Sequence, residues 1–145
     1  MTKVFVNLPV KDLDKSTEFF SKLGFKLNPQ FADNNVSCLF LNDDTYVMLI
    51  KESFFKSISR KEVIQADRQT EVIVAWSVNS KEQVNQMVDF AIANGGKFYR
   101  ETSDQGWICR GSFQDLDNHV WQVIWMDATA IPVIEEDYFR AVTQA

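Results

Sequence analysis

Few residues of this chain could carry out chemistry on their own. Its 145 residues include one histidine, His119, and two cysteines, Cys38 and Cys109. Neither cysteine has a CxxC partner, and a single histidine gives little basis for cysteine–histidine catalysis or a multi-histidine metal site. The cysteines could form a disulfide, act as a catalytic thiol or pack as small hydrophobic residues. In a chain without a visible export signal, packing is favoured.

Composition and charge exclude several classes of function. The net charge is −5, and no cluster of lysine and arginine occurs, so the phosphate backbone of a nucleic acid would be repelled. No apolar run approaches the roughly 20 residues that a membrane-spanning helix needs. The apolar part of the opening MTKVFVNLPV is too short for a signal peptide, so the cytoplasm is the expected location. The length is common for one domain.

The first third of the chain shows a strand, a helix and three further strands. Residues 4–10 alternate, with valine and leucine at the even positions and Phe5, Asn7 and Pro9 at the odd ones. Asp12 is placed to cap a helix that runs to about Leu23. Strand-like stretches follow near 25–31, 36–41 and 46–51, joined by turn-forming asparagines and aspartates.

The same order recurs about 70 residues later, which indicates a structural duplication. Residues 72–78 alternate, with Ile73 and Ala75 on the less apolar face. Ser80 and Gln83 form a capping box before a helix that ends at Gly95. Three strands are predicted near 97–100, 107–114 and 119–126, and Asn118 suits a positive φ in the last turn.

The sequence therefore predicts an α+β domain of two βαβββ modules that form a curved mixed sheet around a ligand trough. The modules are residues 1–51 and 70–127. The connector, residues 52–69, is expected to carry a short helix with Ser59 and Glu62 as a capping box. Its residues Phe54, Phe55 and Ile58 could close over the trough or only pack the connector. In the tail, 128–145, Pro132 could open a helix through Tyr138 and Phe139.

Strand parity predicts which side chains line the trough. They are mostly apolar, with a few polar groups: Phe5, Asn7, Val47, Leu49, Ile73, Ala75, Arg110, Ser112 and Gln122. We expect Asn7, Arg110 and Gln122 to contact a ligand. Cross-sheet hydrogen bonds are the alternative for Asn7 and Gln122, and a solvated charge is the alternative for Arg110. Trp107 could stack on a planar ligand or cover the core, whereas Trp76, Trp121 and Trp125 are expected in the core.

Two motifs resemble a known family. Residues 6–16, VNLPVKDLDKS, resemble the opening of the vicinal-oxygen-chelate superfamily of glyoxalases, bleomycin-resistance proteins and extradiol dioxygenases. Residues 113–123, FQDLDNHVWQV, resemble its closing F-x-D-P-D-G-H-x-W-E-V hairpin, with Leu116 and Asn118 in place of the usual proline and glycine. The resemblance extends from Thr2 to Asp127, and it implies a homodimer that binds a small molecule.

The resemblance also implies where a metal would be held. The family's ligands fall at Phe5, near Leu49, at Ile73 and at Gln122, and only Gln122 offers a donor atom. Divalent cations in proteins need several nitrogen, oxygen or sulfur donors. His119 falls in a hairpin turn, where a packing role is expected.

The leading hypothesis is therefore a binding protein without metal or other cofactor, which holds a small, partly apolar molecule in the trough. Its ligand contacts would be Phe5, Asn7, Leu49, Ile73, Trp107, Arg110 and Gln122. The alternative is a metal-dependent lyase, isomerase or ring-cleaving dioxygenase of the same superfamily. A third possibility is a trough filled by the protein's own side chains.

Overall fold

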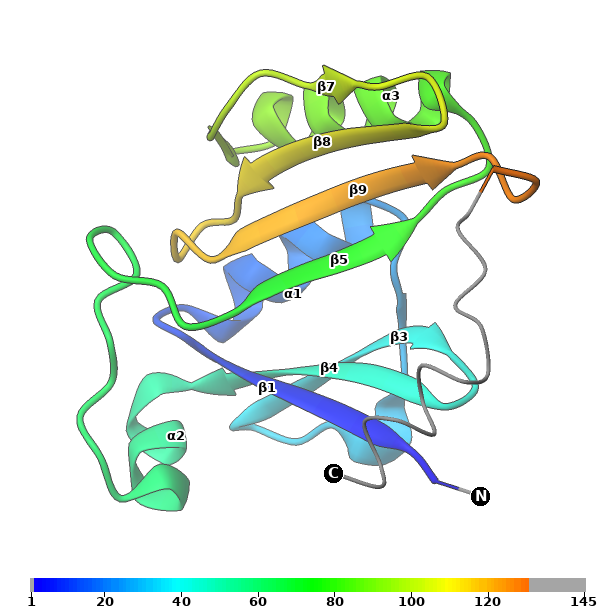
Figure 1. Cartoon of the computed structure of the whole chain (residues 1–145). Coiled ribbons are helices and arrows are strands. Elements are labelled where there is room, and N and C mark those ends of the chain that lie inside the picture. The colour runs from blue at the N-terminus through cyan, green and yellow to red at the C-terminus, as the bar shows by residue number, and fades with distance from the viewer. Residues whose placement is uncertain (1, 131–145) are drawn as a thin grey trace, which may run out of the picture.

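The computed structural model describes residues 2–130, and both modules contain the predicted strand, helix and three further strands, with a 3₁₀-helix and a further short strand in addition (Figure 1). The first contains β1 (Val4–Val10), α1 (Leu13–Lys22), β2 (Lys26–Leu27), the 3₁₀-helix η1 (Pro29–Phe31), β3 (Val36–Asn42) and β4 (Thr45–Lys51). The connector carries α2 (Glu52–Ser59). The second contains β5 (Ile73–Ser77), α3 (Lys81–Ala93), β6 (Lys97–Phe98), β7 (Ser103–Asp104), β8 (Ile108–Gln114) and β9 (Val120–Met126).

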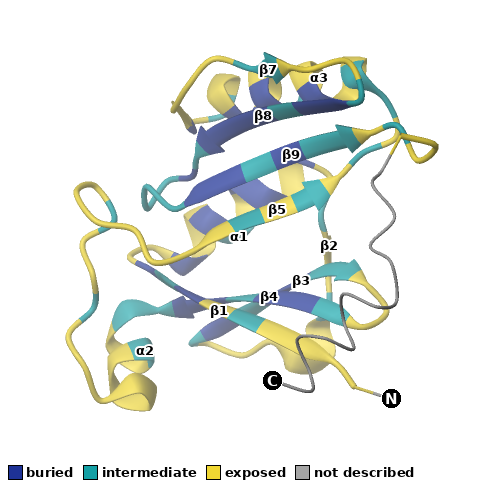
Figure 2. Cartoon of the chain, in the orientation of Figure 1, coloured by how far each residue is buried: buried dark blue, intermediate teal, exposed yellow. Residues whose placement is uncertain are grey.

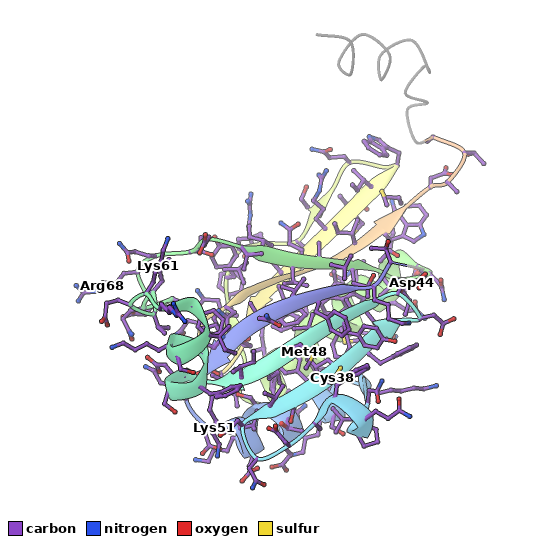
Figure 3. The ribbon with its side chains drawn as sticks, turned by 90° about the horizontal axis from the view of Figure 1, so that it is seen from below. Cys38, Asp44, Met48, Lys51, Lys61 and Arg68 are labelled. Atoms are coloured by element: carbon purple, nitrogen blue, oxygen red, sulfur yellow. The ribbon has the colours of Figure 1, made fainter. Side chains whose placement is uncertain are left out.

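Each module forms a mixed sheet. The strand order is β1-β4-β3-β2 in the first and β5-β9-β8-β6 in the second, where β7 also pairs with β8. The β1–β4 and β5–β9 pairs are parallel, and the other pairs are antiparallel. The edge strands β1 and β5 face each other at the centre of the molecule, where they approach at the end of β1 and the start of β5 and diverge at their other ends (Figures 1 and 3). The α+β prediction and the duplication are confirmed.

The helix α1 joins the two halves into one core. Phe19 and Phe20 are buried on this helix, whose buried residues are dark blue in Figure 2, and the helix packs on β3 and β4. Their rings also reach the second sheet, because the Phe20 centroid lies 4.8 Å from that of Trp121 and the Phe19 centroid 6.2 Å from that of Phe113. The expected core tryptophans are confirmed, since Trp121 is fully buried and Trp76 and Trp125 pack against the same cluster.

The helix ends follow the sequence closely, with one exception. The Asp12 side chain accepts a hydrogen bond from the Lys15 amide, and Ser80 accepts one from the Gln83 amide. The predicted capping box at Ser59 is wrong, because Ser59 is the last residue of α2 and Arg60 ends it with a φ of 57°. The chain enters α2 directly from β4, so that helix begins at Glu52 without a side-chain cap.

Two strand predictions also need correction. The stretch 25–31 forms only the two-residue β2, since Pro29 lacks an amide hydrogen and opens η1 instead. The stretch 97–100 is likewise only β6, and β7 was not predicted. The possible helix at Pro132, Tyr138 and Phe139 lies outside the described residues. No helix within residues 2–130 is long and apolar enough to cross a membrane.

Candidate functional site

The candidate site lies on what we call the trough face, the side of each sheet turned away from the residues that pack with α1 and α3. In the second sheet, Ala75, Gln122 and Ser112 are aligned across β5, β9 and β8. Ser77, Ile124 and Arg110 form the next row. Ile73 begins β5 on the same face and is 46% exposed. Ile73, Ala75, Arg110, Ser112 and Gln122 therefore share one face, as strand parity predicted.

The placement of Leu49 and Val47 on this face is wrong by one residue. In the register of β1 and β4, Leu8 pairs with Leu49, and both are buried in the hydrophobic core together with Val47. Met48, opposite Asn7, takes the trough-facing position instead. Residues 46–50 are all apolar, so the sequence of β4 contains no alternation that could distinguish its two faces.

Aromatic side chains fill much of the trough face of the first sheet. The rings of Phe5 and Tyr46 stack with centroids 5.1 Å apart, and those of Phe31 and Phe40 approach the Tyr46 ring edge-on at 5.9 Å. Cys38 and Met48, paired on β3 and β4, lie beside this group (Figure 3). These rings cover the sheet at this end, where Phe5 is 41% and Phe31 42% exposed.

The open space lies at the opposite end of β1, under the connector. A cavity of about 450 Å³ is bounded by β1, α2, the connector and the residues that lead into β5. Its walls include Asn7, Leu8, Pro9, Phe55, Val63, Ile64, Val72 and His119. Lys61 and Arg68 mark the connector beside α2 in Figure 3. Of the predicted contacts, only Asn7 lines this cavity, and of the three apolar connector residues Phe54, Phe55 and Ile58, Phe55 forms part of its wall.

The closing hairpin holds the two modules together. The Asp117 carboxylate accepts hydrogen bonds from the Lys11 amide at 2.8 Å and from the Ser16 hydroxyl at 3.1 Å. The His119 ring donates to the Pro9 carbonyl over 2.6 Å, which gives this histidine a structural contact while it also borders the cavity. Asn118 has the predicted positive φ, 66°. Asp117 and His119 of the motif thus fix the joint between the modules.

The buried Asp115 organises this hairpin from inside. One carboxylate oxygen accepts the amide hydrogens of Asp117 and His119, and the other accepts the indole hydrogen of Trp121 at 3.0 Å. Burial raises the pKa of Asp115, while the nearby His119 and these hydrogen bonds act in the opposite direction.

The sequence matches the model of the glyoxalase/bleomycin resistance protein/dioxygenase superfamily over residues 4–123. The chain belongs to this superfamily. No curated protein matches the sequence.

Solved structures share the superfamily fold. A hypothetical protein from S. aureus is 28% identical with a TM-score of 0.75, and the match covers 86% of this chain and 94% of that one. A family enzyme from Burkholderia phytofirmans PsJN is 14% identical with a TM-score of 0.75, covering 88% and 100%. A fosfomycin resistance protein from Mesorhizobium loti is 12% identical with a TM-score of 0.62, covering 87% and 92%.

The residues at the superfamily's metal positions do not fit a metal ion. Phe5 and Ile73 offer no donor atom, and Leu49 lies in the core. Gln122 could contribute one neutral amide oxygen beside Ala75 and Ser112. Within residues 2–130 no group of three or more His, Cys, Asp or Glu side chains is placed to hold a metal ion.

The remaining residues singled out from the sequence are Trp107, Arg110 and the two cysteines, and they differ in burial and in bonding partners. Trp107 is partly buried one residue before β8, and its carbonyl accepts a hydrogen bond from the Asp127 amide. Arg110 is partly buried and forms no ion pair with any residue of 2–130. Cys38 and Cys109 are free and buried, as favoured, and burial raises the pKa of both thiols. Thiolate chemistry is accordingly disfavoured at both.

Proposed function

We propose that this superfamily member binds a small, partly apolar molecule in the trough without a metal ion. The cavity beside Asn7 carries this proposal. Its volume of about 450 Å³ falls within the range of roughly 300–1,000 Å³ that is usual for small-molecule sites. Its walls combine apolar side chains with Asn7 and His119 and with the charged residues Lys61, Glu62 and Glu71, so they offer apolar contact area together with polar and charged groups.

A bulky side chain in this cavity should abolish binding. Val72 lines it and is 41% exposed, so Val72→Trp can occupy the space with little effect on the core. A matched control is Val4→Trp, at a 52% exposed residue outside the cavity lining. Compounds found by a thermal-shift screen should bind the wild type and Val4→Trp equally, and Val72→Trp at least about tenfold more weakly. If Val72→Trp bound these compounds as tightly as the wild type, the ligand would bind outside this cavity.

Removal of metal should leave the stability unchanged. A metal bound only to the native state would add about 2.7 kcal/mol at a concentration one hundred times its dissociation constant. We therefore expect the same melting temperature before and after dialysis against EDTA. A lower melting temperature that one divalent ion restores would contradict the metal-free proposal and favour metal-dependent catalysis.

The homodimer expected from the family resemblance stays a prediction, which light scattering would check.

A further inference from the structure

The charge distribution of the trough face singles out one residue. On β1, β3, β4, β5, β8 and β9, strand pairing places only apolar and neutral polar residues on this face, apart from Arg110. The other basic residues at this face lie at its margins. Lys26 and Lys97 are on the outer strands β2 and β6, and Lys3 precedes β1 with its ammonium nitrogen 5.4 Å from the centroid of the Tyr46 ring. Lys97 donates to the Asn118 side chain at 2.7 Å.

Among residues 2–130, no carboxylate compensates the charge of Arg110. Across the strands it is flanked by Ser103 of β7 and Ile124 of β9. No carboxylate within residues 2–130 forms an ion pair with it, and Asp104, on the neighbouring position of β7, is paired with Lys81 at 2.9 Å. A partly buried guanidinium has five donor hydrogens and interacts more strongly with an anion there than in bulk water.

We propose that Arg110 anchors the carboxylate of an organic acid, whose apolar body lies across β9 and β5. This inference goes beyond the proposed function, because it places a ligand of stated chemical class on the trough face at Arg110, outside the cavity lined by Asn7. The planar guanidinium matches a carboxylate in a two-bond arrangement. Ile124 lies directly opposite Arg110 and offers apolar contact. Gln122 and Ala75 follow in the next row of this face, and Ile73 lies one row further along β5. Two strand spacings separate Arg110 from β5, roughly 10 Å, so the body must be longer than that of acetate.

The experiment compares acids with their neutral amides on the full chain. The probes are 3-phenylpropanoate and hexanoate, their primary amides and the corresponding amines, titrated by calorimetry. We expect the acids to bind, and Arg110→Gln to weaken them about 10- to 100-fold while the amides stay unaffected. Arg110→Lys should give an intermediate loss, because it keeps the charge and loses the planar fork.

A matched control removes the same charge elsewhere. Arg100 is exposed just after β6, so Arg100→Gln should leave acid binding unchanged. Equal losses in both variants, or binding of amines in preference to acids, would overturn the role of Arg110. If amides bind as well as acids and Arg110→Gln changes neither, this inference fails while small-molecule binding stands. If no probe binds and the thermal-shift screen also finds no ligand, both fail.

Discussion

Replacement of Asp115 by alanine is expected to lower the free energy of unfolding by about 3 kcal/mol or more. The substitution removes the acceptor for three hydrogen bonds, from the amides of Asp117 and His119 and from the indole of Trp121. Each donor left without a partner in a buried site costs about 1–3 kcal/mol. Urea denaturation followed by tryptophan fluorescence would measure the loss.

A double-mutant cycle isolates the bond to Trp121. Asp115→Asn preserves the volume of the side chain, but its amide group would oppose the indole hydrogen of Trp121. Trp121→Phe removes that hydrogen, so the double variant should lose less stability than the sum of the two single losses. Strict additivity, or an Asp115→Ala variant within 0.5 kcal/mol of the wild type, would contradict the role assigned to this carboxylate.

Leu49→Ala should cost about 2–5 kcal/mol, whereas Met48→Ala should cost about 1 kcal/mol. Leu49 is fully buried in the core opposite Leu8, and Met48 is a partly buried residue on the trough face. The neighbouring pair thus tests the orientation of β4 directly by chemical denaturation. If Met48→Ala lost more stability than Leu49→Ala, the result would show that Met48 faces the core and Leu49 faces the trough.

Strand faces can be predicted from the sequence where apolar and polar residues alternate. β1 and β5 alternate between apolar and less apolar positions, so the faces of Phe5, Asn7 and Ile73 were predicted correctly. Asp12, Ser80 and Asn118 have short-range roles that their own side chains or backbone preferences determine. The uniformly apolar β4 had no such signal, and its parity was assigned wrongly.

The cavity could not be predicted in the same way. Residues 60–72 lack regular periodicity. They border the cavity beside the end of β1 and lead into β5, and this position depends on the packing of α2 and on the approach of the two modules. The aromatic group around Tyr46 likewise requires Phe31, which reaches it only because Pro29 turns the chain into η1. Both features arise from long-range packing, which overrides local propensity.

The position of α1 determines how the two halves depend on each other. Its phenylalanines are shared between both sheets, and Asp117 and His119 hold the residues on either side of its N-terminus. A separately expressed half would expose these aromatic and polar surfaces to water. A break at the exposed Arg60 or Lys61 would leave the shared contacts of α1 in place. The two modules therefore form one folding unit. We expect them to fold together when supplied as two polypeptides, and we expect neither module to fold alone.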